Sequence, residues 1–91
     1  MALNETLKAI NDPVRRAILD LLKTSDWTAG EIAANFDLAP ATVSYHLKLL
    51  REAGLITLNK DKNFIYYSLN LSVFGELLGW IYALGGGPHD R

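Results

Sequence analysis

Hydrophobic positions in the first quarter of the chain recur at the spacing of an α-helix. Leu3, Leu7 and Ile10 follow an i, i+4, i+7 pattern, which predicts a short first helix that ends there. Asp12 then occupies the position of an N-cap, with Pro13 at the first helical position, so a second helix is predicted to begin at Pro13. The apolar stripe of this second helix consists of Val14, Ala17, Ile18, Leu21 and Leu22.

The middle of the chain has the pattern of two short helices joined by a tight turn. Thr28 and Glu31 have the spacing of a capping box, which predicts the start of a third helix. A fourth helix is predicted to open with Pro40 and to be terminated by Gly54. Only residues 37–39 separate the two helices, so they are predicted to form a helix-turn-helix. The apolar stripe of the fourth helix consists of Val43, Leu47 and Leu50.

The hydrophobic pattern changes after Gly54. Residues 55–58 and 64–68 are rich in β-branched and aromatic side chains and flank a polar stretch, which is typical of a β-hairpin. Asn70 or Ser72 is expected to cap a last helix that reaches about Leu84. The pattern therefore predicts a mostly α fold with a small β-hairpin, as a single domain at residues 1–84 followed by a flexible tail at residues 85–91.

The composition is that of one small globular domain. The chain has 91 residues, of which 49% are hydrophobic and 21% are charged. A domain of this size buries only about 60% of the surface that its unfolded chain exposes, so a second subunit is a natural way to complete the core. The apolar stretch at residues 71–84 is shorter than the roughly 20 residues that cross a membrane. The N-terminus lacks the pattern of a signal peptide, and we expect a cytoplasmic protein without membrane insertion.

The residue types exclude several kinds of site. The chain has no cysteine, which excludes disulfides, iron–sulfur clusters, thiolate metal sites and a cysteine nucleophile. No acid–base pair or glycine-rich cofactor loop is visible, so we do not expect an enzyme. The net charge is −1, but residues 41–66 hold four basic and two acidic side chains. One face of the domain is therefore predicted to be basic, as nucleic-acid-binding surfaces are.

Three blocks of the sequence resemble the ArsR/SmtB family of bacterial winged-helix repressors. The blocks are residues 9–19 (AINDPVRRAIL), 41–56 (ATVSYHLKLLREAGLI) and 64–69 (FIYYSL). The resemblance spans roughly residues 3–84 and implies a winged helix-turn-helix of four helices, a β-hairpin wing and a fifth helix. It also implies a homodimeric transcriptional repressor that binds double-stranded DNA. The pattern is most similar to the autorepressor (SdpR-like) branch, which implies repression of the protein's own gene and control by a sequestering partner protein.

The sequence departs from the metal-sensing members of that family. They carry a Cys-x-Cys near the third helix, where this chain has residues 25–29, Ser-Asp-Trp-Thr-Ala. Another family site uses Asp and His on the last helix, where this chain has Glu76 and no histidine. We therefore expect no metal and no other cofactor. Many relatives also open the fourth helix with Ser, where this chain has Ala39, and have Gly and Arg at the wing tip, where it has Asp61 and Lys62.

The fourth helix is predicted to read DNA, and the hairpin is predicted to contact DNA beside it. Short polar side chains near the start of a helix allow close approach to a major groove. We expect Thr42, Ser44 and Tyr45 to contact bases or phosphates, while lysines neutralise phosphate. The alternative for each lysine is a solvated surface. The predicted DNA-binding set is Pro40, Ala41, Thr42, Ser44, Tyr45, His46, Lys48, Lys60 and Lys62.

His46, the two arginines of the second helix and His89 call for separate interpretations. Ser44 and His46 are two positions apart, so they point to different sides of the helix and form no catalytic pair. His46 is expected to be a DNA-side or structural residue. Arg15 and Arg16 are expected to be structural and to pair with carboxylates. His89 lies in the predicted tail and is given no role.

The last helix is apolar nearly all round, which is typical of a helix covered on two sides. We expect a second subunit to cover one side, and the resemblance implies that the first helix contributes to the same interface. Gly75 and Gly79 suggest close helix packing there. Trp80 is an anchor candidate, with the core of its own subunit as the alternative. The predicted dimer interface is Leu3, Leu7, Val73, Leu77, Trp80 and Leu84.

Two functions from different classes remain open on these grounds. The first is a homodimeric repressor that binds a palindromic operator. The alternative is a winged-helix module that binds protein and not specific DNA, favoured by the weak net charge, Asp61 at the wing tip and the missing Ser cap. The signal is equally open: no ligand with simple autorepression, an organic ligand in the dimer groove, or a sequestering protein.

Overall fold

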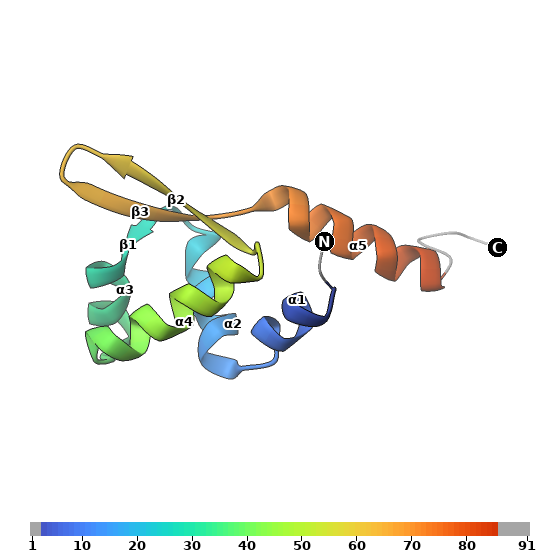
Figure 1. Ribbon diagram of the computed structural model, residues 1–91, viewed down its shortest axis with the longest axis horizontal. Coiled ribbons are helices and arrows are strands. Elements are labelled where there is room, and N and C mark those ends of the chain that lie inside the picture. Colours follow the sequence, from blue (N-terminus) through green and yellow to red (C-terminus); the bar gives the residue numbers. More distant parts are fainter. Residues whose placement is uncertain (1–2, 86–91) are drawn as a thin grey trace.

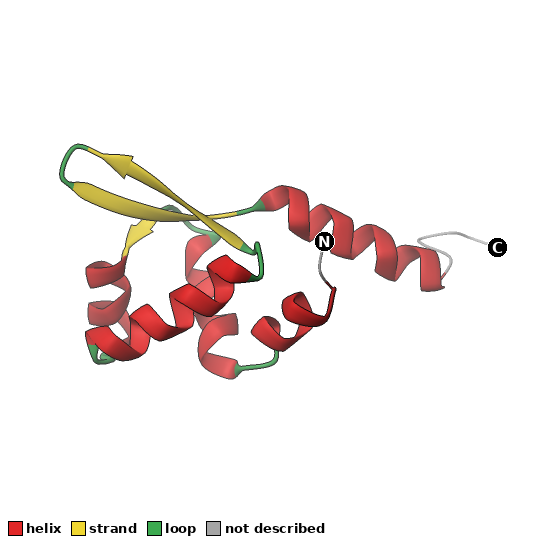
Figure 2. Ribbon diagram, viewed as in Figure 1, coloured by secondary structure: helices red, strands yellow, loops and turns green. Residues whose placement is uncertain are grey.

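The computed structural model describes residues 3–85, which form five helices and three strands (Figures 1 and 2). The flexible tail was predicted at residues 85–91, but its first residue, Gly85, is the last residue of the fifth helix; the rest of the predicted tail, with His89, lies outside the described residues. The predicted helix, helix, helix-turn-helix, hairpin, helix order is confirmed. In chain order, the elements are α1 (Leu3–Ile10), α2 (Pro13–Leu22), β1 (Trp27–Thr28), α3 (Ala29–Phe36), α4 (Pro40–Glu52), β2 (Ile56–Asp61), β3 (Phe64–Leu69) and α5 (Leu71–Gly85).

The helix starts follow the capping chemistry that the sequence predicted. The side chain of Asp12 accepts a hydrogen bond from the main-chain N–H of Arg15, which caps α2. Thr28 and Glu31 form a complete capping box, in which each side chain accepts from the main-chain N–H of the other residue. Helix α4 starts at Ala39 without a side-chain cap. No side-chain hydrogen bond therefore caps the predicted reading helix, whose first residue is Pro40.

Two residues with left-handed backbone terminate α3 and α4. Gly54 has φ of 79° and follows α4, with its own N–H and that of Leu55 bonded to carbonyls of the last turn. Asp37 has φ of 54° directly after α3, where glycine is the usual residue. The left-handed residue at Asp37 turns the chain sharply enough that α4 begins three residues later. This is the tight turn of the predicted helix-turn-helix.

The sheet has three strands, one more than the sequence predicted. Strands β2 and β3 form the expected antiparallel hairpin, with Ile56 opposite Leu69 and Asp61 opposite Phe64. The two-residue strand β1 adds to the other edge of β3, with Trp27 opposite Tyr67. Two residues are too short to show the alternation that identifies a strand, so only the pairing with β3 reveals β1. The pairing anchors the base of the hairpin to the segment before α3, while its tip projects from the helices (Figure 1).

The core lies where α2, α3 and α4 meet under the base of the hairpin. The predicted stripe of α4 is buried, and Ile18, Leu22, Ile32 and Leu55 complete the centre of the cluster. Each fully buried aliphatic side chain of this kind stabilises the fold by about 1.5–3 kcal/mol relative to an exposed one. This packing determines which face of α4 remains outside.

Helix α5 leaves the core after its first turn. Val73 and Phe74 pack against the core, but α5 has no buried residue, and the helix extends away from the rest of the domain (Figure 1). Intrachain packing thus covers less of this helix than the sequence predicted. Asn70, a predicted cap, lies directly before α5, but its side-chain amide donates to the carbonyl of Gly54 at 2.9 Å. That bond ties the start of α5 to the end of α4.

Among residues 3–85, no helix is both long enough and apolar enough to span a membrane.

The uncapped start of α4 predicts a stabilising substitution. Ala39→Ser supplies the missing side-chain acceptor and is expected to raise the free energy of unfolding by about 0.5–1 kcal/mol. Thr28→Ala, which removes an existing cap, is the matched control and is expected to lower it by about 1 kcal/mol. Urea denaturation followed by circular dichroism, at one fixed protein concentration, measures both. An unchanged or lower stability of Ala39→Ser would contradict this account of the α4 start.

Candidate nucleic-acid interface

The exposed face of α4 carries most of the residues predicted to contact DNA. With Val43, Leu47 and Leu50 buried, the first turns present short or polar side chains to solvent. The ring of Tyr45 is 58% exposed. The structure therefore leaves exposed, within residues 40–48 of α4, Pro40, Ala41, Thr42, Ser44, Tyr45 and Lys48.

His46 differs from the other predicted contact residues because it is half-buried. Its ring lies beside that of Tyr45, with centroids 5.5 Å apart in an edge-on arrangement. The Nη1 atom of Arg15 lies 3.2 Å from its Nδ1. Of the two interpretations left open for His46, the contacts favour the structural one.

The arginines of α2 contact main-chain carbonyls and not the carboxylates that the sequence predicted. Arg15 donates to the carbonyls of Ala9 and Lys8, and Arg16 donates to the carbonyl of Ile10. The reason is geometric. Helix α1 ends directly beside the start of α2, so the carbonyls of its last turn, two of which also accept from the main-chain N–H groups of Asn11 and Asp12, lie within reach of both guanidinium groups. The expected pairing with carboxylates is therefore wrong in the described part of the chain, while the structural role of both residues stands.

The Asp12 carboxyl lies next to this cluster and stays ionised. The hydrogen bond from the main-chain N–H of Arg15 lowers the pKa of Asp12, and the charge of the Arg15 side chain lowers it further, although burial acts in the opposite direction. Because the pKa of Asp12 is lower in the folded than in the unfolded chain, its carboxylate stabilises the fold at any pH above the unfolded-state pKa. This stabilisation is lost as the pH falls through the folded-state pKa. The start of α2 therefore keeps its cap at neutral pH.

The wing places two lysines beyond the reading helix. Lys60 is in β2 opposite Ile65, and Lys62 occupies the first position of the two-residue turn to β3. Both side chains are exposed, and Asp61 lies between them in sequence. The φ of Lys62 is 58°, in the left-handed region where turns of this kind usually have glycine. A lysine held in this conformation costs roughly 1 kcal/mol relative to glycine.

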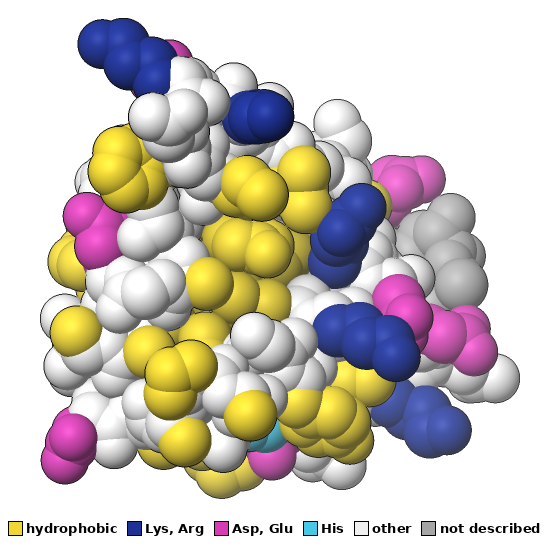
Figure 3. All heavy atoms as spheres, turned by 60° about the vertical axis from the view of Figure 1, so that its left-hand side comes forward, with side chains coloured by type: hydrophobic (Ala, Val, Ile, Leu, Met, Phe, Trp, Pro, Cys, Tyr) yellow, Lys and Arg dark blue, Asp and Glu magenta, His cyan; other side chains and the backbone are white. Residues whose placement is uncertain are grey.

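A groove of about 490 Å³ separates α4 from the wing. Ser44 and Lys48 line it from α4, Tyr67 lines it from β3, and Arg51 lies at the same edge as Lys48. Arg51 was one of the basic residues of the predicted basic face, but it was not among the residues predicted to contact DNA. Its i+3 spacing from Lys48 was the signal that could have found it. On the face shown in Figure 3, basic side chains lie at the top, where the wing is, and along the right-hand side, and hydrophobic side chains are exposed between them.

The described residues show no clustered metal ligands. Residues 3–85 contain no group of three or more His, Cys, Asp or Glu side chains placed to hold a metal ion. The chemistry of this surface is that of hydroxyl, phenol, ammonium and guanidinium groups around one helix and one hairpin, with the carboxylates of Glu52 and Asp61 beside them. Such groups recognise phosphate and base edges through hydrogen bonds and charge.

Comparisons with known proteins agree with this geometry. A helix-turn-helix domain family matches residues 10–59. The transcriptional repressor SdpR of Bacillus subtilis is 46% identical over 79 residues, which cover 87% of this chain and 88% of that protein. An arsenical resistance operon repressor of Staphylococcus aureus is 33% identical over 84% of this chain and 73% of its own length. A crystal structure of an ArsR family transcriptional regulator matches with a TM-score of 0.81 at 27% identity, over 92% of this chain and 87% of that one.

The left-handed backbone at Lys62 predicts opposite effects on stability and on binding. Lys62→Gly relieves the backbone strain and is expected to raise the free energy of unfolding by about 0.5–1 kcal/mol, while the loss of charge weakens DNA binding. Lys60→Gly removes the same charge from a strand and is expected to lower stability, because glycine weakens strands. Urea denaturation and DNA titration of both variants separate the two effects. Unchanged DNA affinity in both variants would exclude the wing from the interface.

Proposed function

The chain belongs to the ArsR family of winged helix-turn-helix transcriptional regulators, and we propose that it is a homodimeric repressor that binds a palindromic DNA operator. Membership of this family makes it a DNA-binding regulator and not an enzyme. The observation that carries the finer proposal is the exposed polar first half of α4, whose opposite face is buried in the core. We place its action in the cytoplasm, where the operator is.

Helix α4 enters the major groove of the operator. Ala41 and Thr42 are small enough for the helix start to approach the base edges closely, and Thr42, Ser44 and Tyr45 offer hydroxyl groups for hydrogen bonds. Lys48 and Arg51 face the groove beside the wing, where they neutralise the phosphates of one strand. Lys60 and Lys62 extend this contact along the wing. Repression follows because the bound dimer occludes RNA polymerase.

Exposed apolar residues on α1 and α5 support a dimer interface made by these helices. Leu7 is 44% exposed, Leu84 is 70% exposed and Trp80 is 42% exposed, which supports Trp80 as an interface anchor over the alternative that it belongs to the core of its own subunit. A Cβ atom added to Gly75 or Gly79 would meet nothing within 4 Å, so these glycines relieve no crowding inside the chain. A neighbouring helix of a second subunit could approach closely there. Leu3, Val73 and Leu77 are half-buried and border the exposed residues.

The likeness to SdpR supports autorepression as the simplest mode of action. In this mode the protein binds upstream of its own gene, and its occupancy is set by its concentration. Release by a sequestering partner protein is the further prediction that the autorepressor branch implies. Neither mode requires a metal or another cofactor.

The proposed DNA contacts predict a palindromic, salt-dependent operator. Selection from random double-stranded DNA is expected to return a palindrome with half-sites about 10 bp apart, bound with a slope of log K against log salt of about −7 for the contacts that Lys48, Arg51, Lys60 and Lys62 make in both subunits. Lys48→Ala removes two of these contacts and should make the slope about 2 less negative, while Lys23→Ala, at an exposed lysine directly after α2, should leave it unchanged.

The same titration with Thr42→Ala and Tyr45→Ala is expected to weaken operator binding while dimerisation persists. Absence of any enriched sequence, with a slope close to zero, would reject the repressor and support the protein-binding module.

The proposed dimer interface predicts that a charge on α5 weakens the dimer. Trp80→Glu places a charge on the exposed face of α5 and is expected to shift the protein from dimer to monomer at micromolar concentration. Phe64→Glu is the matched control, because Phe64 is also an exposed aromatic side chain (57%) but lies on the wing. Sedimentation velocity of both variants measures the shift. A Trp80→Glu protein that stays as dimeric as the Phe64→Glu protein would exclude α5 from the interface.

A further inference from the structure

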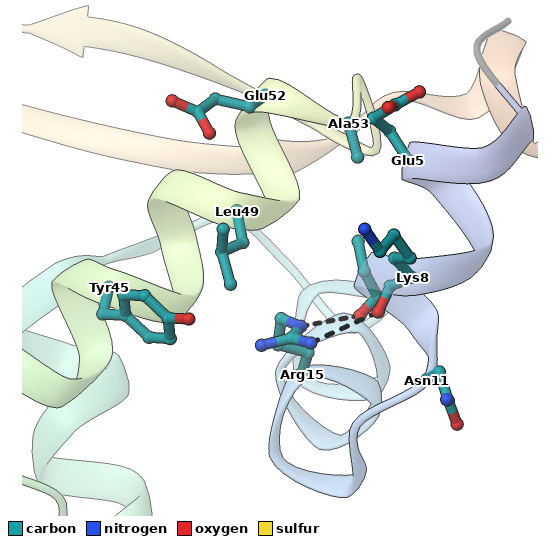
Figure 4. A pocket seen from close by; sticks show the side chains of 9 residues that line it. Glu5, Lys8, Asn11, Arg15, Tyr45, Leu49, Glu52 and Ala53 are labelled. Carbon is teal, nitrogen blue, oxygen red and sulfur yellow. Dashed lines mark hydrogen bonds between the residues drawn. The ribbon is translucent and has the colours of Figure 1, made fainter.

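The side chain of Arg15 joins three helices. From α2, its Nε donates to the carbonyl of Ala9 at 2.7 Å, and its Nη2 donates to the carbonyl of Lys8 at 3.3 Å, both at the end of α1. Its Nη1 lies 3.2 Å from Nδ1 of His46 in α4. Figure 4 shows the two bonds to α1 at the floor of a groove of about 520 Å³, with Tyr45 on its α4 side.

The contact between Arg15 and His46 determines which ring nitrogen of His46 accepts a hydrogen bond. A guanidinium group has only N–H donors, so Nδ1 of His46 accepts this hydrogen bond. The ring is then neutral and carries its hydrogen on Nε2. A second proton on the ring would occupy Nδ1, remove the acceptor and place two positive charges side by side. The link between Arg15 and α4 therefore exists only with neutral His46.

Charged groups face this contact from the turn before α2 and from α1. Asp12, the N-cap of α2, lies close enough for a positive charge on His46 to lower the pKa of its carboxyl. From α1, Lys8 and Glu5 line the groove around Arg15 and carry opposite charges. On α4 itself, the Tyr45 ring packs edge-on against His46. The direct partner of Nδ1 is Arg15, so the contact is broken when His46 gains a proton.

We propose that Arg15 is a positioning residue for DNA recognition, which fixes α4 relative to α1 through neutral His46. This inference rests on the proposed function, in which α1 belongs to the dimer interface and α4 reads the operator. The angle between these helices sets the distance between the two reading helices of a dimer, and half-sites in DNA have a fixed spacing. Protonation of His46 frees α4 from Arg15, and operator affinity falls.

Operator affinity measured from about pH 8 to about pH 5.5 tests the proposal. The affinity of the natural protein is expected to fall about tenfold, the loss typical of one hydrogen bond to a charged group. In His46→Asn, the side-chain oxygen replaces Nδ1 as an acceptor that cannot be protonated in this range, so the pH dependence of operator affinity is expected to disappear, whatever the affinity at pH 8. Arg15→Gln is expected to bind weakly at every pH. The matched control is His89→Asn, which changes the only other histidine and should retain the full pH dependence.

Several outcomes would overturn the proposal. Affinity that rises on acidification in the natural protein but not in His46→Asn would make His46 a direct phosphate contact. A flat profile in the natural protein, or an unchanged profile in His46→Asn, would also reject the positioning role. Circular dichroism checks that Arg15→Gln folds, and His46→Asn decides the matter if it does not.

A measurement without DNA separates this inference from the proposed function. Nitrogen NMR of the His46 ring is expected to show an unprotonated Nδ1 near pH 8 in the natural protein and a changed Nδ1 signal in Arg15→Gln. This result combined with no operator binding would reject the proposed function and the positioning of DNA recognition, while the Arg15–His46 link would stand. A proton on Nδ1 near pH 8 would reject the link itself.

Discussion

Val43, Leu47 and Leu50 bury one face of α4 among the other helices, and this burial decides which of its side chains face solvent. Because a helix turns about 100° per residue, a fixed buried stripe leaves one orientation for the opposite face. That face holds Thr42, Tyr45 and Lys48. Loss of this packing would release the reading helix even if every polar residue on it stayed in place. The core and the interface are thus two sides of one helix.

The connections at the ends of α4 depend on the same packing. At its start, the left-handed Asp37 turns the chain after α3, and at its end the left-handed Gly54 leads directly into the buried residues Leu55 and Ile56, where β2 begins. Asn70 binds the carbonyl of Gly54 and so joins the start of α5 to the end of α4. The reading helix, the wing and the exposed helix α5 are consequently held as one unit around the end of α4.

A short chain has enough apolar surface for one core and keeps part of it outside. The core of residues 3–85 covers the first turn of α5 and leaves most of its apolar side chains exposed. Exposed apolar surface of this extent on a small protein typically marks an interaction surface. The wing shows a related compromise, because Lys62 keeps a strained backbone at a turn where glycine would be relaxed. Both features cost stability in the single chain and suit a protein that acts with a partner and with DNA.

The sequence by itself determined the helices, their caps and the hairpin, because these depend on neighbouring residues: the stripe of α4, the capping box of Thr28 and Glu31, and the turn-forming Gly54. It also separated the exposed face of α4 from the buried one. Only the tertiary structure decided the pairing of β1 with β3, the carbonyl partners of Arg15 and Arg16, the contact of Arg15 with His46, and the position of Arg51 beside the wing. These features join residues up to about 40 positions apart, and no local periodicity records which distant groups the packing of the helices brings within hydrogen-bond reach.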